Sequence, residues 1–566
     1  MKRGILIAIL IIVIFVILIG LIAGFIYMQL NHEPYIADNS FLKINLEGRI
    51  EDNEDSPFSN ATTVEDLFYH IKRAKIDKRI KGIILKISYL YTGFSTTEDI
   101  GRIIKDFQKS GKKVYAFIYY GGIKEYYLAT FADKVYAYKG GDLFLTGLAT
   151  EAIFLKNTLS KLGIKAELFH IAEYKTATNI FTQDKMTSAH RESVQKLLDD
   201  IYISTLQGIS KNRNIKLESI KNIVNESPVS NARYLKAGLI DKIIYEDEIL
   251  KSLKTDYKIT KFETYKQTSS PKPFKAKKKI ALIFASGEIN SGKSGGKSIT
   301  GDKILGSETL SKYLRIARKS PSIKAVVLRI NSPGGSALAS DEIRREAELL
   351  VKKKPLVISM SDVAASGGYW ISISSSKILA LPQTITGSIG IISGKFVLKD
   401  LYGKIGLNKE ILKTSEYAAM FSDYKEFTPS EKEKLMRVMR NIYNDFLIKV
   451  AKSRNMKVAD VDNIAKGRVW SGDSALKLNL IDKIGGINEA FEEAKKLAKI
   501  PASESVGIRI YPKKKSLIDS ILGLLFNFKG AKAKIENPIK LTIEEKLIRY
   551  KQFFPAMMMP FKLIIN

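Results

Sequence analysis

The sequence contains no cysteine. This absence excludes disulfide bonds, metal sites built on thiolates and catalysis by a cysteine nucleophile. Histidine is also scarce: the chain has four, at His32, His70, His170 and His190, and none follows in the rest of its 566 residues. Any chemistry that needs a histidine must therefore take it from the first third of the chain.

Negative charge is in short supply as well, because 59 Asp and Glu residues face 91 Lys and Arg residues and leave a net charge of +32. Such a chain is attracted to anionic surfaces, either nucleic acid or anionic lipid. The basic residues are spread along the sequence, and no nucleic-acid-binding module is recognisable. We therefore expect no nucleic-acid partner. The hydrophobic fraction of 45% is typical of a folded chain with large cores.

A long apolar run at the N-terminus predicts a membrane anchor. Lys2 and Arg3 precede an uncharged segment at residues 4–31, and about 20 apolar residues are enough to cross a bilayer. A cleaved signal peptide is the alternative, but its apolar region is usually only about 7–15 residues and a clear cleavage site is missing here. Since positive flanks stay in the cytoplasm, we expect a single-pass membrane protein whose residues from about 33 onward lie outside the cytoplasm.

The chain also contains an internal repeat. Ser322–Ile330 resembles Arg79–Ile87 at a displacement of 243 residues, and Tyr369 follows Tyr126 at the same displacement. Self-similarity at a fixed displacement indicates two copies of one structural unit. The predicted organisation has five parts, namely an anchor at 1–31, a first repeat at 32–255, a linker at 256–278, a second repeat at 279–510 and a C-terminal extension at 511–566. We expect the extension to contact either an oligomer partner or the membrane.

Each copy alternates short apolar runs with helical patterns. The runs predicted as strands lie at 41–46, 82–87, 114–119, 279–285, 325–330 and 356–360. Strands that alternate with helices of about 10–15 residues indicate β-α-β crossovers. The sequence therefore predicts an α/β fold with a mostly parallel sheet in each copy.

Two turns of the second copy are candidates for catalysis. Asn331-Ser-Pro-Gly-Gly335 directly follows a predicted strand, and its glycines allow the backbone N–H groups to face an oxyanion. An ordinary tight turn is the alternative for this segment. Asp362-Val-Ala-Ala-Ser-Gly-Gly-Tyr-Trp370 places Ser366 between a strand and a helix, beside the amide of Gly367. That position suits a nucleophilic serine and equally suits a helix N-cap.

A nucleophilic serine needs a base, and the second copy has no histidine. A lysine can serve if burial disfavours its ammonium form. In the repeat alignment Lys175 of the first copy corresponds to Ala418, whereas Ser366 of the second corresponds to Ile123. We therefore expect a split site in which the first copy supplies the lysine and the second supplies the serine.

Taken together, these motifs resemble the long form of signal peptide peptidase A, also called protease IV, a family of membrane-anchored serine peptidases. The resemblance extends from the N-terminus to about residue 500, and its most specific segments are Tyr174–Ala177, Asn331–Gly335, Ala364–Trp370, Thr386–Gly390 and Gly467–Gly472.

The resemblance implies a Ser/Lys dyad in which Ser366 is the nucleophile, Lys175 is the general base and Ser388 orients the lysine. It implies an oxyanion hole formed by the backbone of three glycines, Gly334, Gly335 and Gly367. It further implies a tandem duplication of a ClpP/crotonase-like domain, a homotetramer, signal peptides as substrates, and no need for a cofactor or metal.

Other interpretations remain open at this point. Gly287-Glu-Ile-Asn-Ser-Gly-Lys-Ser294 satisfies the pattern of a phosphate-binding loop, which would make the chain a nucleotide hydrolase. Against this, Gly287 has a repeat partner in Gly48 and residues 295–301 continue as a loop. His170 or His190 is an alternative base, since histidine is the commonest one. A third interpretation is a non-catalytic membrane scaffold.

Overall fold

The computed structural model describes residues 33–54, 61–251, 256–269, 276–298, 303–513 and 556–558, and the single positions 4, 14, 17, 18, 20, 271 and 274. The predicted anchor at 1–31, apart from those single positions, and most of the C-terminal extension lie outside the described residues. None of the helices within the described ranges combines the length and the apolar composition that a bilayer span requires.

The first copy is built on a parallel sheet. Its six strands, in spatial order, are β8 (Lys242–Ile244), β5 (Lys134–Tyr138), β3 (Lys113–Ile118), β2 (Ile80–Leu90), β1 (Ser40–Gly48) and β9 (Lys258–Lys261). The helices α2 (Val64–Ile76), α3 (Phe94–Gln108) and α4 (Ile123–Ala129) supply crossovers between these strands. Parallel neighbours require such crossovers, so the predicted α/β architecture is confirmed here.

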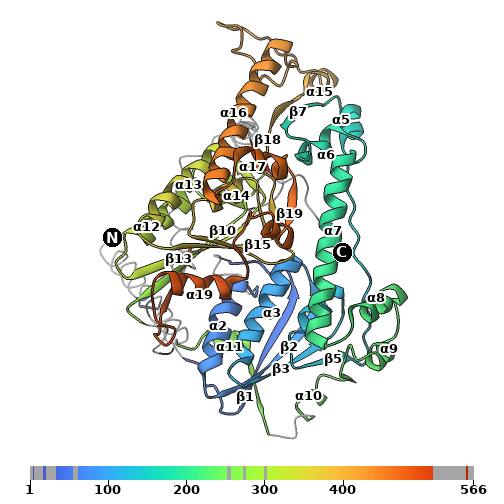
Figure 1. Cartoon of the computed structure of the whole chain (residues 1–566), viewed down its shortest axis with the longest axis vertical. Helices are drawn as coiled ribbons and strands as arrows, with labels where there is room; N and C mark the ends of the chain where they lie inside the picture. Colours follow the sequence, from blue (N-terminus) through green and yellow to red (C-terminus); the bar gives the residue numbers. More distant parts are fainter. Residues whose placement is uncertain are drawn as a thin grey trace.

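The second copy repeats this plan. Its sheet contains β19 (Val469–Ser471), β17 (Ile385–Gly387), β15 (Leu356–Ala365), β13 (Ile323–Ser332), β10 (Lys279–Ser286) and β21 (Gly507–Tyr511). In addition, β16 (Lys377–Ala380) pairs with β15, and β20 (Lys483–Ile484) pairs with β16. Its connecting helices include α12 (Ser307–Lys319), α13 (Ala337–Val351), α14 (Gly367–Ser372) and α18 (Gly472–Lys477). In Figure 1 this sheet lies above that of the first copy.

Equivalent side chains make equivalent bonds in the two copies. Tyr126 donates its hydroxyl hydrogen to the carbonyl of Leu239 at 2.7 Å, and Tyr369 donates to the carbonyl of Leu480 at 2.8 Å. All four residues are buried. Buried hydroxyls need such partners, so the two tyrosines that the repeat alignment matches make the same internal bond in both copies.

A third sheet combines strands from both copies. Its strands are β12 (Ile304–Gly306), β11 (Glu288–Asn290), β14 (Gly334–Ser336), β22 (Ala556–Met558), β18 (Ile391–Val397) and β7 (Lys165–Ile171). β7 comes from the first copy and pairs along its whole length with β18 of the second. The chain that follows β7, which contains Lys175, is thereby delivered into the second copy.

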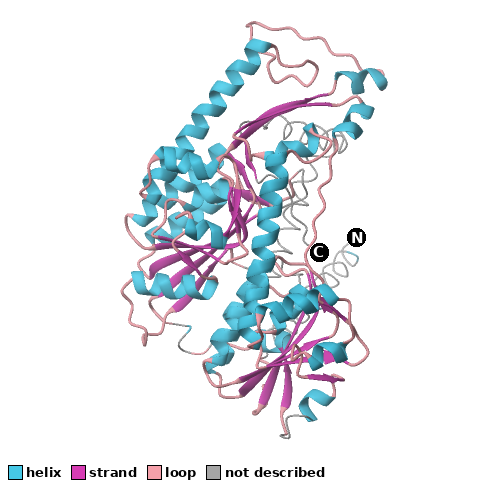
Figure 2. Ribbon diagram, turned by 45° about the vertical axis from the view of Figure 1, so that its right-hand side comes forward, coloured by secondary structure: helices cyan, strands magenta, loops and turns pink. Residues whose placement is uncertain are grey.

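Two long helices flank this exchanged region. They are α7 (Ser188–Arg213) and α16 (Pro429–Arg454), each of 26 residues and each at the same place in its repeat. α7 runs beside both halves of the molecule (Figures 1 and 2) and contacts β19 of the second.

Part of the predicted linker belongs to the first sheet. β9 pairs with β1, and α11 (Phe262–Lys266) follows it with Phe262 and Tyr265 buried. Arg73 of α2 then donates to the carbonyls of Thr268 and Ser269. The first structural unit therefore continues to at least residue 269 within the range expected to be linker.

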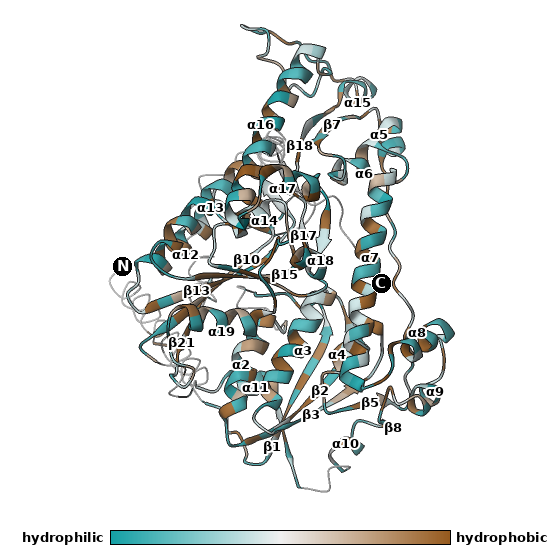
Figure 3. Cartoon of the chain, viewed as in Figure 1, coloured by the Kyte–Doolittle hydropathy of each residue, from teal (hydrophilic) through white to brown (hydrophobic). Residues whose placement is uncertain are grey.

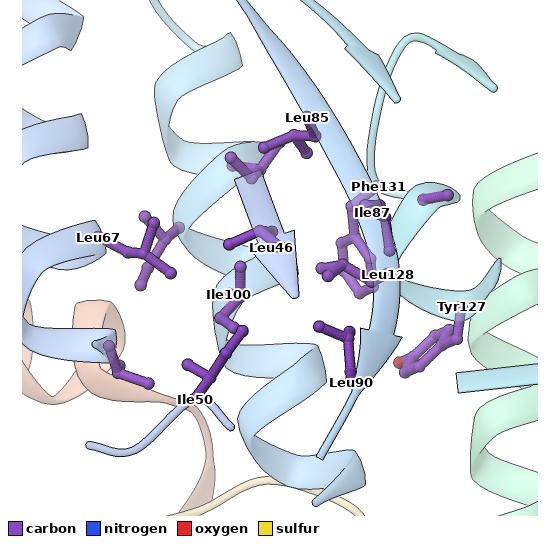
Figure 4. Close-up of a cluster of buried hydrophobic side chains, with 14 of the residues drawn as sticks. Leu46, Ile50, Leu67, Leu85, Ile87, Leu90, Ile100, Tyr127, Leu128 and Phe131 are labelled. Atoms are coloured by element: carbon purple, nitrogen blue, oxygen red, sulfur yellow. The ribbon is translucent and has the colours of Figure 1, made fainter. Parts of the chain in front are cut away.

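One hydrophobic core spans the boundary between the copies. It contains first-copy residues such as Leu46, Leu85 and Ile100 (Figure 4), and it also contains Phe491 of α19 (Ile487–Leu497) from the second copy. Figure 3 shows hydrophobic stretches along β10 and β13 and both polar and apolar residues along helices such as α7. Because interiors are close-packed, the two copies are held in one fixed relation, which the site described next requires.

Candidate active site

The structure brings Lys175 and Ser366 together. Lys175 Nζ lies 2.7 Å from Ser366 Oγ although the two residues are 191 positions apart, and both side chains have no solvent exposure. Ser366 stands at the end of β15, immediately before α14. Lys175 follows β7 and precedes the short 3-10 helix Thr176–Thr178. The two halves of the expected split site therefore meet.

Ser388 completes the surroundings of the lysine amine. Lys175 Nζ donates to the carbonyl oxygen of Ser388 at 2.9 Å and to its Oγ at 2.8 Å. Burial lowers the pKa of Lys175 well below its usual value of 10.5, because an ammonium ion is poorly solvated in a protein interior. A neutral amine has two N–H groups and one lone pair. With both N–H groups directed at Ser388, the lone pair is left for the hydroxyl hydrogen of Ser366.

The backbone around the amine is strained. Ser366, Ser388 and Ala172 have φ angles of 56°, 53° and 88°, a region that residues other than glycine seldom adopt. Each such conformation costs about 1–3 kcal/mol and persists only where the surrounding structure enforces it. All three positions lie close to Lys175, since Ala172 accepts from its backbone N–H at 3.2 Å. The strain is thus concentrated at the site.

The glycines of the two motifs pack against each other. Gly334 and Gly335 have φ angles of 107° and 149°, and a Cβ on Gly335 would lie 2.1 Å from the carbonyl oxygen of Ile289. A Cβ on Gly367 would lie 3.2 Å from the backbone nitrogen of Gly335. A side chain is excluded at Gly335, and the backbone nitrogen of Gly335 lies beside Gly367, the residue that follows Ser366.

Two further glycines make room for the lysine. A Cβ on Gly467 would lie 2.5 Å from the backbone nitrogen of Lys175, and one on Gly390 would lie 3.1 Å from its Cδ. Beside Gly467, the carbonyl oxygen of Lys466 accepts from the backbone N–H of Tyr174 at 2.8 Å. Sequence reasoning recognised the segments that contain these glycines only as family motifs and assigned them no role. Their role follows from the packing of Lys175 between them.

Substituting Gly467 tests this packing. Gly467→Ala is expected to lower kcat/KM about 10- to 100-fold, because a displacement of about 1 Å at a catalytic group has an effect of this size. Gly406→Ala is the matched control, since Gly406 has nearly the same φ, 73° against 74°, but has no atom within 4 Å of the added Cβ. Steady-state peptide hydrolysis by both variants measures the effect. Equal activity of the two variants would contradict the packing argument.

The two histidines considered as alternative bases, His170 and His190, have other neighbours. His170 is on β7, and its Nδ1 lies 2.8 Å from the carbonyl oxygen of Ala172. His190 is buried in α7 with its ring against Phe154. The nitrogen that contacts Ser366 Oγ at 2.7 Å is that of Lys175.

The predicted phosphate-binding loop has a different structure. Within Gly287–Ser294, residues Glu288–Asn290 form β11, which pairs with β12 and β14. Ser294 is tied to the segment that follows, because its Oγ accepts from the backbone of Gly306 at 2.9 Å. A phosphate-binding loop leads from a strand directly into a helix, whereas this segment leads to another strand. The nucleotide-hydrolase interpretation therefore finds no support.

An extended segment of the chain lies beside the glycine turn. β22 pairs antiparallel with β14, with Gly335 opposite Met557, and it also pairs with β18, where Ile392 is opposite Ala556. Both β14 and β18 can thus accept an added strand between them. Such addition is a common way for proteins to bind peptides.

Comparison with known proteins agrees with this geometry. The sequence matches the family described as peptidase family S49 over residues 106–260 and 348–501, one region in each copy. It is 36% identical to the chloroplastic serine protease SPPA of Arabidopsis thaliana over 83% of this chain and 71% of that protein.

Two bacterial proteins named protease 4 are also similar. The one from Haemophilus influenzae is 31% identical over 83% of this chain and 78% of its own length, and the one from Salmonella typhi is 33% identical over 77% and 72%. With a family match in both halves and a buried lysine–serine contact between them, the chain belongs to peptidase family S49 and is a serine peptidase.

Proposed function

We propose that this peptidase cleaves peptide bonds with Ser366 as nucleophile, Lys175 as general base and Ser388 as the residue that orients the lysine. The observation that carries the proposal is the 2.7 Å contact between Lys175 Nζ and Ser366 Oγ in a fully buried setting. A neutral amine at this distance can accept the hydroxyl hydrogen, as general-base catalysis requires.

In the first step the Ser366 hydroxyl transfers its proton to the Lys175 amine while Oγ attacks the peptide carbonyl carbon. The carbonyl oxygen becomes an oxyanion, which the backbone N–H groups of Gly335 and Gly367 stabilise. The N–H of Gly334, the third expected donor, is directed instead at Ser332 Oγ at 3.2 Å. One such donor contributes about 2.7–4 kcal/mol. The C–N bond then breaks, the ammonium of Lys175 returns its proton to the leaving amine, and an ester to Ser366 remains.

Water completes the reaction. The neutral Lys175 takes a proton from water, the resulting hydroxide attacks the ester carbonyl, and Ser366 leaves with the proton that the lysine held. The enzyme is regenerated and the second peptide is released as an acid. None of these steps requires a nucleotide, a metal or another cofactor.

The substrate class follows from the surroundings of the dyad. The same apolar burial that lowers the pKa of Lys175 favours apolar segments over charged ones. The substrate strand is placed between β14 and β18, where β22 already shows backbone pairing. We assign cleaved signal peptides and similar apolar segments as substrates, in line with the resemblance to signal peptide peptidases.

A chain that ends at residue 555 tests this position of the substrate strand. Its kcat/KM for a peptide substrate is expected to rise about 3- to 10-fold, because β22 no longer competes for the edges of β14 and β18. The full-length chain assayed with an added peptide of residues 550–566 is the control, and inhibition there is expected to be competitive. Unchanged kcat/KM in the shortened chain would contradict this position of the substrate.

The wider organisation is proposed in the same terms. Residues 1–31 are assigned as a single anchor in the inner membrane. This assignment places both ClpP/crotonase-like repeats on the periplasmic side, the first extending from residue 32 to at least 269 and the second from 279 to 510. The oligomer is assigned as a homotetramer. Support for a subunit contact comes from large aromatic side chains that remain exposed where β2 and β3 end, namely Tyr89, Tyr91 and Tyr120, at 51%, 68% and 40% exposure.

The direct test of the function is active-site labelling. The purified chain is treated with a peptidyl phosphonate, which reacts with nucleophilic serines, and the modified residue is mapped by mass spectrometry. We expect modification at Ser366 and, in parallel, hydrolysis of a signal peptide in the presence of a metal chelator and without nucleotide. Modification at another serine would refute the assignment.

A further inference from the structure

The ladder between β13 and β15 is interrupted just before the nucleophile. Ile330 pairs with Met360, and the next pair is Ser332 with Ala364. β13 thus advances by two residues while β15 advances by four, so residues 361–363 form a bulge in β15. Bulges next to active sites redirect the side chains that follow. Here the nucleophile Ser366 follows three residues after the bulge.

Asp52 of the first copy holds one side of this bulge. It is 2% exposed, and its Oδ2 accepts from Asn331 Nδ2 at 2.8 Å. Its Oδ1 accepts from Arg329 Nε at 2.8 Å and from Ser361 Oγ at 3.0 Å. Asn331 in turn accepts from the backbone N–H of Val363 at 3.3 Å. One carboxylate from the first copy therefore joins the end of β13 to the bulge of β15.

The N-terminus of α3, also from the first copy, holds the other side. Thr96 donates from its backbone and its hydroxyl to the carboxylate of Asp362, at 2.8 and 2.7 Å. Ser95 donates its hydroxyl hydrogen to the carbonyl of Ser361 at 3.1 Å. A Cβ on Gly93 would lie 2.2 Å from Asp362 Oδ1, so the fit at this point is close. These side chains replace ladder bonds that the bulge lacks.

Arg329 is the cation at the centre of this cluster. It is fully buried and lies 2.7 Å from Asp99 Oδ2 as well as 2.8 Å from Asp52 Oδ1. It also donates to Ser359 Oγ and Ser361 Oγ, each at 2.9 Å. A buried charge needs compensation of this kind. With two carboxylates facing it, Arg329 stays compensated when one of them is neutralised.

We propose that Asp52 is a positioning residue for catalysis: by joining Asn331 to the bulge in β15, it aligns the glycine turn that follows Asn331 with Ser366. This inference rests on the proposed roles of Ser366 and Gly335. The first copy would then contribute to the site in two ways, by providing Lys175 and by positioning the bulge through Asp52. The bulge and the turn belong to the second copy, and their alignment depends on a carboxylate from the first.

The donor–acceptor pattern at Asp52 permits a specific test. Both oxygens of Asp52 accept, from Arg329 on one side and from Asn331 on the other. Asp52→Asn keeps the shape but places an NH2 group against one of these donors. We expect kcat to fall about 10- to 100-fold with KM within about 2-fold of the original, because misalignment of the reacting groups affects the transition state most. Labelling of Ser366 by the phosphonate should slow by a similar factor.

The double variant Asp52→Asn/Asn331→Asp exchanges donor and acceptor. The new carboxylate can accept from both the new amide and the Val363 N–H, while the amide oxygen at position 52 still accepts from Arg329. We expect kcat to recover to within about 3-fold of the original value, as coupled pairs in contact do. A purely structural loss at position 52 would not be repaired in kcat by this exchange.

Asp241→Asn is the matched control. Asp241 also accepts from an arginine, Arg213, at 2.9 Å and from a backbone N–H, that of Val135, at 2.8 Å, but it lies within the first copy. We expect a lower melting temperature with unchanged kcat. If Asp52→Asn does not fold, Ser361→Ala removes the hydroxyl that joins the bulge to Asp52 Oδ1 at 3.0 Å and is expected to lower kcat about 3- to 10-fold.

The outcomes separate the two levels of the proposal. Unchanged kcat in a folded Asp52→Asn variant, or in Ser361→Ala if that variant replaces it, overturns the positioning role, as does a double variant no better than the single one. Those results leave the Ser/Lys dyad intact as long as Ser366→Ala is inactive. Full activity of Ser366→Ala would instead overturn the proposed function itself.

Discussion

Ser366→Ala is expected to reduce peptide hydrolysis about 10⁴-fold or more, which is the usual loss when the nucleophile of a serine peptidase is removed. The substitution removes only Oγ, which in this structure is buried next to the lysine amine. Substrate binding should be largely kept, because the strands β14 and β18 are untouched. The measurement is kcat and KM with a signal peptide, together with binding of the same peptide to the variant.

Ser372→Ala is the control for this result. Ser372 is also buried, and its hydroxyl donates to the carbonyl of Gly368 at 2.8 Å within α14. Its loss should cost about 1 kcal/mol of stability and leave kcat unchanged. If Ser366→Ala kept more than about a tenth of the original kcat, the nucleophile would have to be sought elsewhere.

Lys175→Met is expected to have an effect of similar size on kcat. Methionine fills a comparable volume but cannot accept a proton, so the attack of Ser366 loses its general base. Residual activity at about 10⁻⁴ of the original would reflect the oxyanion hole and substrate binding alone. The rate of the unsubstituted enzyme should rise with pH as Lys175 loses its proton, at a pH well below 10.5, because burial lowers its pKa.

The same pKa shift makes stability depend on pH. Above the lowered pKa the native protein holds a neutral Lys175, whereas the unfolded chain binds a proton there up to about pH 10.5. The unfolded state therefore binds one more proton, and the free energy of unfolding rises with pH by about 1.4 kcal/mol per unit in this window. Below the lowered pKa both states carry the proton and this contribution to the slope is zero. The free energy of unfolding, measured with urea at a series of pH values, should lack this slope in Lys175→Met.

Lys112→Met is the matched control. Burial lowers the pKa of Lys112 to about 8, and its amine donates to the carbonyls of Ala74 and Asp77, which also belong to the first copy. Its loss should change stability and leave kcat unaffected. His170→Ala and His190→Ala should also keep activity. If Lys175→Met remained active while His170→Ala did not, the assignment of the base would be wrong.

Much of the fold followed from local patterns. The apolar runs around β1, β2, β10 and β13 were recognisable because a strand buried on both faces is apolar along its length. The repeat was visible because Tyr126 and Tyr369 keep the same buried bond, so both copies retained the same side chain. The linker was placed too early, because β9 is short and three of its four residues are polar, and its pairing with β1 is not encoded in its composition.

Part of the candidate site could also be predicted from the sequence by comparing the two copies. Reciprocal loss of the lysine from one copy and of the serine from the other is a property of the sequence, and it pointed to a site shared by the two. The roles of Gly467 and Gly390 could not be predicted from the sequence, because the need for a glycine is evident only when the atom that would clash with a Cβ is known. Asp52 was missed for a similar reason, since its partners lie more than 270 residues away.

The sequence alone determined the duplication, the α/β class of each copy and the division of the lysine and serine between them, because all three depend on residue type and spacing. Only the tertiary structure decided that β7 crosses into the second copy and brings the Lys175 amine to 2.7 Å from Ser366. It alone also placed first-copy side chains against the bulge that precedes Ser366. Contacts between distant segments arise from packing of the whole chain, and local sequence carries no record of which segments will meet.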